Sequence, residues 1–406
     1  LALVAQLEQA DIYDWAANAR PEQIEPDDYN IWLLMGGRGM GKLLRMDEPI
    51  PTPSGWTTMG ALQVGDKVMD EHGQPCRVIG AYDTETPEMA YRFTFSDGAT
   101  IESGSEHLWV TWTHAERKSY LRRASRAGFP EDWAGRPARS TQEIVDTVRY
   151  GTRGDRNHCI PTAEPLELPE GDLPIEPYLL GYWLGDGASA GASFTCGDLD
   201  RPHLQAAIVA AGYEIGRTRP SDPITFGVTG GLYVDLKALG LLKNKHTPGP
   251  YLRGSASQRL AVLAGLMDSD GYADKESANV EFSSTNPRLV LDVFELAVSL
   301  GQKPSIGHGR ATINGRDCGD KWRVTWRPTI NPFRLARKVE RFRPPGAQSL
   351  RNRHRMIVSV EPVESVPMRC ISVDSPNSMY LASRWMIPTH NTYTGSQTVR
   401  DWTENQ

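Results

Sequence analysis

The stretches Leu179-Leu-Gly-Tyr-Trp-Leu-Gly-Asp-Gly187 and Leu263-Ala-Gly-Leu-Met-Asp-Ser-Asp-Gly271 decide how the centre of this sequence folds. They share the first leucine, the first glycine and the closing Asp-Gly. Small residues within each stretch let two helices approach closely, and each helix then ends in an acid. The sequence therefore predicts an internal duplication in which Asp186 and Asp270 meet at the end of a helix pair.

The duplication continues beyond these two helices. Phe194 lies in a short strand that leads to a helix ending at Gly212, and Phe282 lies in one that leads to a helix ending at Gly301. This repeated order predicts two similar α+β halves. Further on, residues 321–327 alternate as a strand with one polar face, which suits a DNA major groove but is also typical of any half-solvated strand. That face carries Lys321, Arg323, Thr325 and Arg327.

The second stretch differs from LAGLIDADG at two positions, and the pair resembles the homing endonucleases named after that motif. The resemblance implies that Asp186 and Asp270 share Mg²⁺ ions, which activate water against both strands of a DNA duplex. It also implies an active-site lysine, with Lys245 preferred over Lys243. Asp268 is expected to be a helix-end residue. Since both halves lie in one chain, the endonuclease is expected to be a monomer. Two buried helices without activity would have the same pattern.

Two basic runs suit a phosphate backbone, although such runs are usually solvated faces. Residues 334–355 contain eight Arg or Lys against Glu340 alone, and residues 117–126 contain five against no acid. The stretch 117–156 is either an added arm that contacts DNA or a surface insertion.

Outside the duplication, residues 43–80 and 368–391 indicate short alternating strands. They are separated by Pro-Ser-Gly, Val-Gly-Asp and His-Gly-Gln turns. Such a pattern predicts an all-β unit whose two halves pair around whatever lies between them.

These two segments resemble the first and last blocks of an intein, a self-splicing Hint domain, and the final Thr-His-Asn before Thr392 is specific in that position. The resemblance implies an all-β, horseshoe-like splicing domain formed by residues 43–162 and 346–391. An α+β LAGLIDADG endonuclease at residues 163–345 would interrupt it.

Most inteins begin with a Cys or Ser, but this segment begins with Leu43. Cys370 lies in the late block, Trp109 follows His107 by two residues, and Thr392 follows the insert. This combination resembles the class 3 inteins, which start without a nucleophile. Trp109 is expected either to shield the thiol from water or to pack the block.

The resemblance implies that Cys370 attacks the carbonyl of Lys42 and holds the upstream segment as a thioester. His107 would orient that peptide bond and protonate the departing Leu43 amine. A hydroxyl near His107 is expected from Ser103 or Ser105, because the usual block threonine is replaced by Gly104. Ser378 stands where a late-block histidine is common.

At the downstream junction, the resemblance implies that Thr392 receives the acyl group. Asn391 then cyclises to a succinimide with assistance from His390, and Lys42 becomes joined to Thr392. Splicing of this kind needs no cofactor.

The outermost segments complete a second pattern. Residues 31–35 indicate a buried strand that runs into a phosphate loop from Gly36 through Gly41 to Lys42. The Ser or Thr that should follow is missing, and Thr392 supplies it after excision. The ligated sequence, GGRGMGKTYTGSQTVRDW, would bind ATP and Mg²⁺ through Gly36, Gly41, Lys42 and Thr392.

Residues 1–42 and 392–406 resemble fragments of an α/β P-loop ATPase, the large terminase subunit of a bacteriophage. The resemblance implies a phage-encoded protein in the cytoplasm of a bacterial host, whose ligated flanks join a DNA-packaging motor. The homing target would be the uninterrupted host gene at the P-loop codons. Two alternatives are a terminase ATPase fragment that carries an inactive passenger, and a folded, unspliced, binding-only relic.

Composition agrees with a globular protein of more than one core. The 406 residues are 39% hydrophobic and 23% charged, with a net charge of −6. Apolar runs fall far short of the roughly 18 residues of a membrane span, so no membrane partner is expected. Five widely spaced cysteines without a CxxC pair favour a reducing cytosol over a disulfide or zinc framework.

Overall fold

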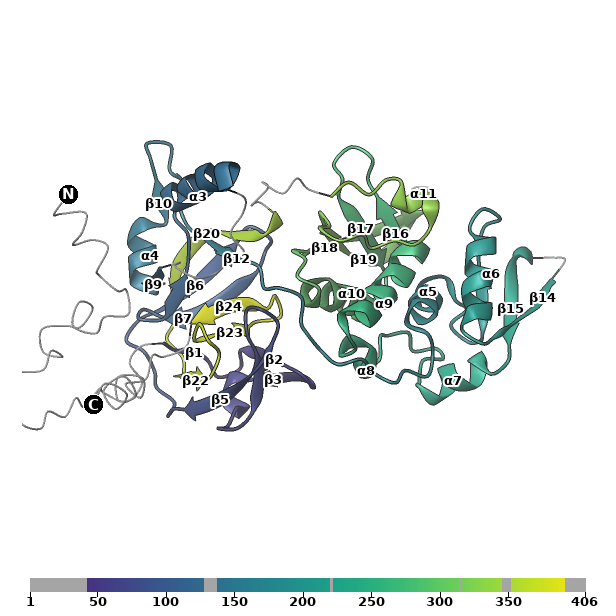
Figure 1. Cartoon of the computed structure of the whole chain (residues 1–406), viewed down its shortest axis with the longest axis horizontal. Helices are drawn as coiled ribbons and strands as arrows, with labels where there is room; N and C mark the ends of the chain where they lie inside the picture. The colour runs from purple at the N-terminus through teal and green to yellow at the C-terminus, as the bar shows by residue number, and fades with distance from the viewer. Residues whose placement is uncertain (1–41, 128–136, 220–221, 314–315, 345–351, 391–406) are drawn as a thin grey trace, which may run out of the picture.

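The computed structural model describes residues 42–127, 137–219, 222–313, 316–344 and 352–390. Figure 1 shows two lobes. In the strand-rich lobe, the purple and blue early part of the chain lies together with the yellow late part. The teal and green middle of the chain forms a second, helix-rich lobe.

The strand-rich lobe is built from both ends of the described chain. β1 (Leu44–Arg45) lies between β7 (Thr100–Gly104) and β21 (Met368–Arg369), and it pairs antiparallel with each. The six-stranded sheet has the order β12-β20-β6-β7-β1-β21. Its other strands are β6 (Ala90–Phe95), β12 (Cys159–Pro161) and β20 (His354–Val363). The pairing of β1 with β21 agrees with the prediction that early and late segments form one unit.

Four smaller antiparallel sheets, β22-β5-β4, β2-β3, β23-β24 and β8-β9, complete the framework around the junction. Their strands are β2 (Pro49–Thr52), β3 (Gly55–Thr58), β4 (Lys67–Met69), β5 (Pro75–Ala81), β8 (Leu108–Val110), β9 (Ala138–Ser140), β22 (Ile371–Val373), β23 (Met379–Ala382) and β24 (Ile387–His390). The predicted Pro-Ser-Gly and His-Gly-Gln turns join β2 to β3 and β4 to β5.

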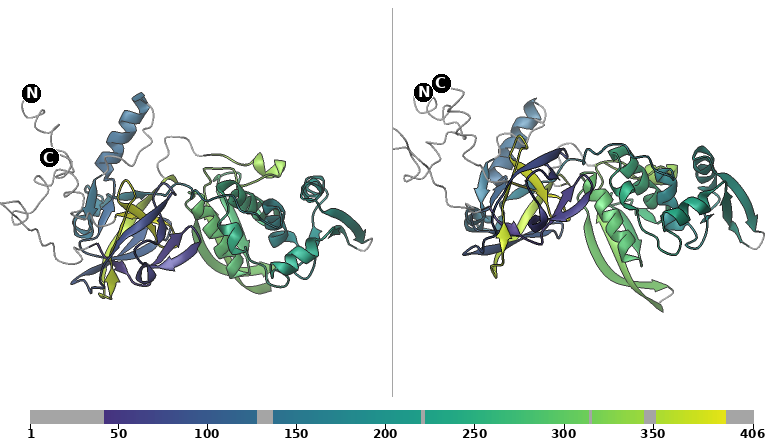
Figure 2. Two further views of the ribbon diagram at one scale, coloured as in Figure 1. Left: turned by 60° about the horizontal axis from the view of Figure 1, so that its bottom comes forward. Right: turned by 90° about the horizontal axis from the view of Figure 1, so that it is seen from below.

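The expectation of an all-β splicing unit is wrong for the segment after β8. That segment forms α3 (His114–Ala127) and α4 (Thr141–Thr147), with a hairpin of β10 (Arg149–Tyr150) and β11 (Asp155–Arg156). α4 begins with a reciprocal capping box between Ser140 and Glu143, a local signal for a helix start. Figure 2 shows α3 projecting from the lobe, an arrangement that fits both an arm that contacts DNA and a surface insertion.

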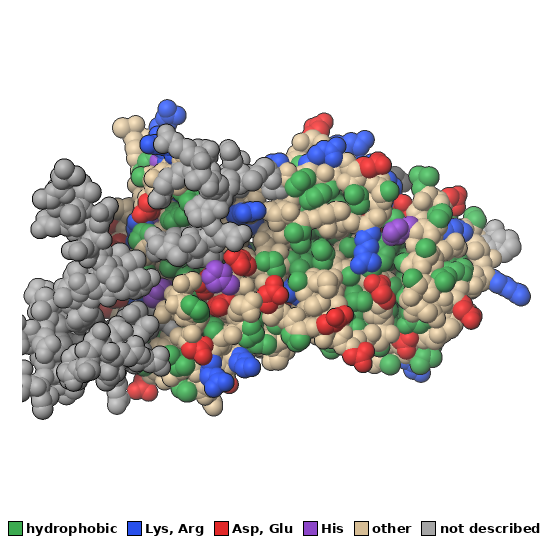
Figure 3. Space-filling model, viewed as in Figure 1, with side chains coloured by type: hydrophobic (Ala, Val, Ile, Leu, Met, Phe, Trp, Pro, Cys, Tyr) green, Lys and Arg blue, Asp and Glu red, His purple; other side chains and the backbone are tan. Residues whose placement is uncertain are grey.

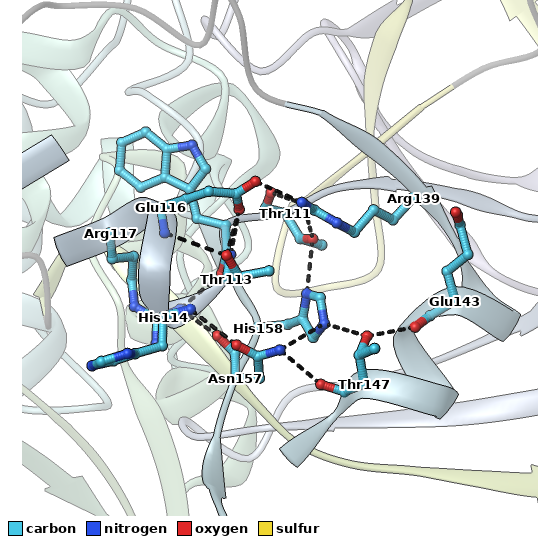
Figure 4. Close-up of polar contacts among 11 residues, drawn as sticks. Thr111, Thr113, His114, Glu116, Arg117, Arg139, Glu143, Thr147, Asn157 and His158 are labelled. Atoms are coloured by element: carbon cyan, nitrogen blue, oxygen red, sulfur yellow. Dashed lines mark hydrogen bonds and ion pairs between the residues drawn. The ribbon is translucent and has the colours of Figure 1, made fainter. Parts of the chain in front are cut away.

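A buried polar network anchors this insertion (Figure 4). His158 is fully buried, and its Nδ1 and Nε2 share hydrogen bonds with the hydroxyls of Thr111 (3.1 Å) and Thr147 (2.9 Å). Arg139 donates to the carbonyl of Thr111 (2.9 Å) and pairs with the Glu116 carboxylate (2.6 Å). These bonds connect both helices to the strands around β8.

The helix-rich lobe confirms the predicted duplication. α5 (Pro177–Asp186) packs against α9 (Ala256–Ser269), and one antiparallel sheet follows each helix, β13-β15-β14 and β16-β17-β19-β18. The strands are β13 (Ser193–Thr195), β14 (Glu214–Arg219), β15 (Asp222–Thr229), β16 (Gly271–Ala273), β17 (Val280–Ser284), β18 (Ser305–Ile313) and β19 (Arg316–Trp326). The other helices are α6 (Arg201–Ala210), α7 (Leu232–Ala238), α8 (Gly249–Leu252), α10 (Pro287–Ser299) and α11 (Ala336–Val339).

Glycines bring α5 and α9 into backbone contact. A Cβ on Gly181 would overlap the carbonyl of Val262, and one on Gly265 would overlap the backbone of Tyr178 and Tyr182. The predicted helix ends are confirmed after α6 and α10, where Gly212 (φ 86°) and Gly301 (φ 71°) adopt left-handed conformations. Within the described ranges, every helix is too short or too polar to cross a membrane.

The two lobes share part of one hydrophobic core. Leu381 and Met386, from the β23-β24 hairpin, belong to the same buried cluster as α9 and α10. Phe294 of α10 meets Trp385 in the turn of that hairpin edge-on, with ring centroids 5.3 Å apart. The helix-rich lobe therefore contacts the hairpin that leads to His390.

Candidate functional sites

The upstream junction lies inside the strand-rich lobe. Leu44 pairs with Arg369, so the register places Leu43 across from Cys370. Leu43, Cys370, Ala90 and Met368 form one buried cluster, in which Cys370 is 1% exposed. The Leu43 carbonyl accepts a hydrogen bond from the N–H of Gly104 (3.1 Å). The thiol thus belongs to the same buried cluster as Leu43, the residue that follows the Lys42–Leu43 peptide bond.

His107 is fully buried close to this bond. Its Nε2 shares a short hydrogen bond with the hydroxyl of Thr389. Nδ1 completes no hydrogen bond among the described residues, although the Lys42 backbone lies near enough to affect the ring. Burial lowers the pKa of His107 to about 3. The Lys42 backbone opposes this shift, and the charges of Lys42 and His390 add to it.

Lys42 is the last residue before the junction, and its side chain is largely withdrawn from water. Burial lowers the pKa of Lys42 to about 8, and the neighbouring Cys370 acts in the opposite direction. Lys42 also acts electrostatically on His107, as does His390. The early residue Lys42 and the late residue His390 therefore both lie near His107.

Trp109 packs rather than lining the thiol. It is fully buried, its ring centroid lies 4.7 Å from that of His107, and its Nε1 donates to the Thr141 hydroxyl (3.1 Å). The Phe93 ring also packs against the Trp109 ring, with the two ring centroids 4.8 Å apart. Of the two roles expected for Trp109, the structure favours packing of the block.

The hydroxyl that contacts His107 comes from Thr389 and not from the expected Ser103 or Ser105, and Ser103 Oγ bonds to Thr141 Oγ1 (3.1 Å). Ser378, which stands where a late-block histidine is common, lies in the turn before β23 with φ 53°. Sequence reasoning missed the contact of Thr389. The available signal was that Thr389 immediately precedes His390. The predicted residues Gly36, Gly41, Asn391 and Thr392 lie outside the described residues.

A second site lies where α5 and α9 end. Burial and then repulsion by Asp270 raise the pKa of Asp186 to about 6. Burial likewise raises the pKa of Asp270, and Lys245 and Lys338 oppose that shift. The Asp270 carboxylate lies 3.3 Å from where a Cβ on Gly185 would stand. The structure thus brings the two predicted acids together.

Lys245, the preferred lysine, reaches this acid pair. Its Nζ donates to the carbonyls of Gly185 (2.8 Å) and Gly187 (2.6 Å) at the end of α5. Burial lowers the pKa of Lys245, while Asp270 and Asp186 oppose the shift. Lys243 instead takes a left-handed backbone conformation (φ 58°) in the preceding turn.

Lys338 has the equivalent position at the end of α9, and sequence reasoning missed its role. Its Nζ donates to the carbonyls of Met267, Asp268 and Gly271, each at 2.7 Å. Burial lowers the pKa of Lys338 to about 8, opposed most by Asp268 and also by Asp186. The sequence singled it out only as part of a basic run.

Asp268 is a structural residue, as expected for a helix-end acid. It is 1% exposed, and its Oδ2 accepts hydrogen bonds from the Tyr178 hydroxyl (2.9 Å) and from the backbone N–H groups of Arg334 and Leu335. These bonds hold the segment that leads to α11 against the helix pair.

The donor set at the helix ends fits Mg²⁺ in charge and chemistry. Asp186 and Asp270 provide two carboxylates, and in the described ranges a third His, Cys, Asp or Glu does not join them. Mg²⁺ is commonly held by one or two carboxylates and completes its shell with waters and phosphates.

The predicted polar strand face is present on β19. Val324 and Trp326 are buried, whereas Arg323 is exposed on the opposite face. Figure 2 shows the β18-β19 hairpin extending from the lobe. A surface of this kind is accessible to a large ligand such as a nucleic acid.

Three residues of the basic run 334–355 make contacts within the protein. Arg355 is 1% exposed and pairs with Asp97 (2.7 Å), Arg337 pairs with Asp200 (2.6 Å), and Lys338 is buried at the helix ends. Figure 3 shows Lys and Arg side chains along the upper edge of the helix-rich lobe, near α11, with acids among them. The expectation of a solvated face that suits a phosphate backbone is therefore wrong for Lys338 and Arg355, whereas Arg337 is 45% exposed.

Residues 257–341 match the family model of the LAGLIDADG-like domain. The chain is 40% identical over 367 residues to a protein named replicative DNA helicase DnaB from Mycobacterium intracellulare, which covers 89% of this chain and 60% of that protein. It is 37% identical over 102 residues to a protein of the same name from Mycobacterium leprae (strain TN), covering 24% and 17%. The chain thus spans less than two thirds of either relative.

Two solved structures cover 86% of this chain and 99% of their own chains. They are the MchDnaB-1 intein, 15% identical with a TM-score of 0.28, and the Msm DnaB1 intein splicing domain bound with zinc, 14% identical with a TM-score of 0.27. TM-scores of this size establish no shared fold.

Proposed function

We propose that residues 43–391 form a self-splicing element that excises itself and joins Lys42 to Thr392. One observation supports this proposal: in the register of β1 with β21, Leu43 lies opposite Cys370, and the two residues share a buried cluster. Residues from the other end of the element, Thr389 and His390, reach the same histidine, His107.

In the first step, the Cys370 thiolate attacks the Lys42 carbonyl. The new S–C bond replaces the C–N bond to Leu43, and the proton lost by the thiol ends on the Leu43 amine. His107 lies near Lys42, and its low pKa makes the protonated ring a strong acid that can pass that proton to the Leu43 amine. Thr389 fixes the ring orientation through Nε2.

In the later steps, the Thr392 hydroxyl takes the acyl group from Cys370, and the side-chain nitrogen of Asn391 attacks its own carbonyl. Cyclisation releases the element with a C-terminal succinimide, assisted by His390 at the end of β24. A shift of the acyl group from oxygen to nitrogen then leaves an ordinary Lys42–Thr392 peptide bond. None of these steps requires a cofactor.

Intact-mass measurement of the freshly expressed chain under reducing conditions tests this proposal. We expect a species with residues 43–391 and a peptide in which residues 1–42 precede 392–406. Cys370→Ala should abolish both products. Cys318→Ala is the matched control, since Cys318 is exposed in the β18-β19 hairpin and should splice normally. An unspliced wild-type chain would overturn the proposal.

We propose that the helix-rich lobe is a DNA endonuclease that cuts the host gene lacking this insert, at its P-loop codons. The acid pair at the ends of two closely packed helices supports this assignment, together with the family match of residues 257–341. Asp186 and Asp270 would hold Mg²⁺, which when bound supplies charge neutralisation at the phosphate and an activated water. The chain contains both halves, so a monomer suffices.

Within this site, the chain's own residues organise the acids. Lys245 and Lys338 hold the last carbonyls of α5 and α9, and they offset part of the repulsion between the carboxylates. The exposed face of β19, with Arg323, is the surface proposed to follow the DNA groove.

Incubation with two DNA duplexes and Mg²⁺ tests the nuclease. One duplex carries the uninterrupted Lys-Thr codons, and the other is interrupted there by the insert's coding sequence. Cleavage of the first duplex only is expected, with loss of cleavage in Asp270→Asn. The control Asp274→Asn changes an exposed acid in the turn after β16 and should cut normally. Equal cleavage by Asp270→Asn would overturn the assignment.

The flanks are proposed to be fragments of a P-loop ATPase that gains its phosphate site on ligation. Two hosts are candidates. A phage terminase is suggested by the resemblance of residues 1–42 and 392–406, and a replicative helicase is suggested by the names of the two relatives. Those alignments must consist mostly of the insert, since 89% of the chain is covered and the flanks are short. ATP binding by the ligated full-length host, and not by the precursor, is the expected outcome.

A further inference from the structure

Cys370 has an electrostatic difficulty that the proposed splicing mechanism leaves open. The thiol is 1% exposed in a cluster with Leu43, Ala90 and Met368. Apolar burial disfavours a thiolate, yet the thiolate is the nucleophile. A buried charge of this kind needs a partner of opposite sign.

We propose that Lys42, the residue whose carbonyl is attacked, also activates the attacking thiol through its side-chain ammonium. This inference rests on the proposed splicing function and adds an electrostatic role for the upstream segment. Lys42 precedes Leu43, which the strand register places across from Cys370. Its largely buried side chain interacts electrostatically with Cys370.

Within the described part of the chain, neither the Tyr380 hydroxyl nor the His107 ring supplies the positive charge. Burial raises the pKa of Tyr380 well above its ordinary value, so Tyr380 is neutral at pH 7. Burial lowers the pKa of His107 to about 3, so that ring is neutral as well. Lys42, with a pKa of about 8, remains mostly protonated at pH 7.

His390, the last described residue, acts electrostatically on His107, as Lys42 does. The guanidinium of Arg369, the residue before the thiol, is directed away to the carbonyls of Tyr82, Gly60 and Leu62. Lys42 thus has both the position and the charge state that the thiolate requires.

The ammonium takes part in no bond change. The S–C bond forms, the C–N bond to Leu43 breaks, and the thiol proton is transferred to the departing amine. After ligation, Lys42 is free to serve as the phosphate-binding lysine of the proposed P-loop. One lysine would therefore serve the splicing reaction first and the host later.

The full chain carrying Asn391→Ala and Thr392→Ala isolates the first step. Hydroxylamine cleaves the thioester on Cys370 and thereby releases residues 1–42. The hydroxylamine concentration is raised until the release rate no longer changes, so that thioester formation limits the rate. The rate is then measured by mass spectrometry from pH 6 to 9.5 for Lys42, Lys42→Met and Lys42→Arg.

An opposite charge at contact distance shifts a titration by about 1 to 3 units. Removal of the ammonium should therefore move the pH midpoint of Lys42→Met upward by at least about 1 unit. At pH 7 this shift lowers the thiolate fraction of Cys370 about tenfold. Because a more basic thiolate is about threefold more nucleophilic, the release rate of Lys42→Met should fall by only about threefold. At high pH, Lys42→Met should equal or exceed the original rate.

Lys42→Arg should restore the original midpoint because it restores the charge. Lys67→Met, which removes an exposed lysine on β4, should match the original profile. A uniform loss at every pH, or an unchanged midpoint in Lys42→Met, would overturn this role of Lys42. In both cases the splicing proposal stands, because only a parent chain that releases no peptide would contradict that.

Discussion

Thr389 is the residue that fixes the orientation of the His107 ring. Its hydroxyl bonds to Nε2 of the buried His107, and the loss of one partner leaves that nitrogen unpaired, at a cost of about 1 to 3 kcal/mol. We expect Thr389→Val to slow release of residues 1–42 by roughly fivefold or more, since about 1.4 kcal/mol corresponds to tenfold.

Thr389→Ser keeps the hydroxyl and is the matched control. Both variants are to be compared by the same hydroxylamine assay, with far-ultraviolet circular dichroism as the check on folding. Equal rates in the valine and serine variants would show that the contact between Thr389 and His107 does not orient the ring.

Among the elements, the α5–α9 pair depends on a close backbone approach. A Cβ at position 265 would overlap the backbone of Tyr178 and Tyr182 in α5. Gly265→Ala should therefore separate the helices, lower the free energy of unfolding of this lobe by about 1 to 3 kcal/mol and abolish DNA cleavage.

Urea unfolding and the duplex-cleavage assay measure the two effects. Gly191→Ala is the control, because nothing lies within 4 Å of the added Cβ. Normal cleavage by Gly265→Ala would mean that the acids at the helix ends tolerate a wider separation.

The helical insertion of the strand-rich lobe should be acid-sensitive. Burial, with Arg139 next, lowers the pKa of His158 from 6.5 to about 4. The unfolded chain therefore binds this proton more readily, so stability is complete above pH 6.5 and falls as the pH drops towards 4. The maximum loss is about 3 kcal/mol.

His158→Gln retains polar contacts but cannot titrate. It should be less stable at pH 7 and show a shallower decline in melting temperature between pH 6.5 and 4 than the unmodified chain. Parallel declines would assign the acid sensitivity to other groups.

For the molecule as a whole, the contact between Phe294 and Trp385 links the two lobes. Phe294 is buried against a turn in which Ser383 (φ 70°) and Met386 (φ 49°) hold conformations that cost of order 1 kcal/mol each. We expect Phe294→Ala to destabilise the chain by about 3 to 5 kcal/mol.

Urea unfolding, with hydrogen exchange in β23 and β24, measures this link. Exchange in both strands should accelerate in Phe294→Ala. Leu291→Ala is the control on the same helix, because Leu291 is 56% exposed and its truncation should cost under about 0.5 kcal/mol. Unchanged exchange would show that the hairpin does not depend on the helix-rich lobe.

Sequence reasoning reached the duplication, the two acids, Lys245 and the buried thiol because each lies in a local pattern. It failed for Lys338, which stood out only as part of a basic run, and for Thr389, although that residue directly precedes His390. Arg355 was misread as a surface cation, because a basic run does not reveal a single buried partner such as Asp97. The helices α3 and α4 were missed because the all-β expectation outweighed the local capping signal at Ser140.

By itself, the sequence indicated the nested order of the described chain, in which paired strand segments enclose a duplicated helix motif. These features are local in spacing, so they can be read along the chain. Only the tertiary structure decided which groups meet: Thr389 with His107, 282 positions apart, and Lys42 with Cys370. Strand register and burial fix those contacts and set the charge states around the thiol. Register and burial both arise from contacts between segments that are far apart in the sequence, so a single segment cannot reveal them.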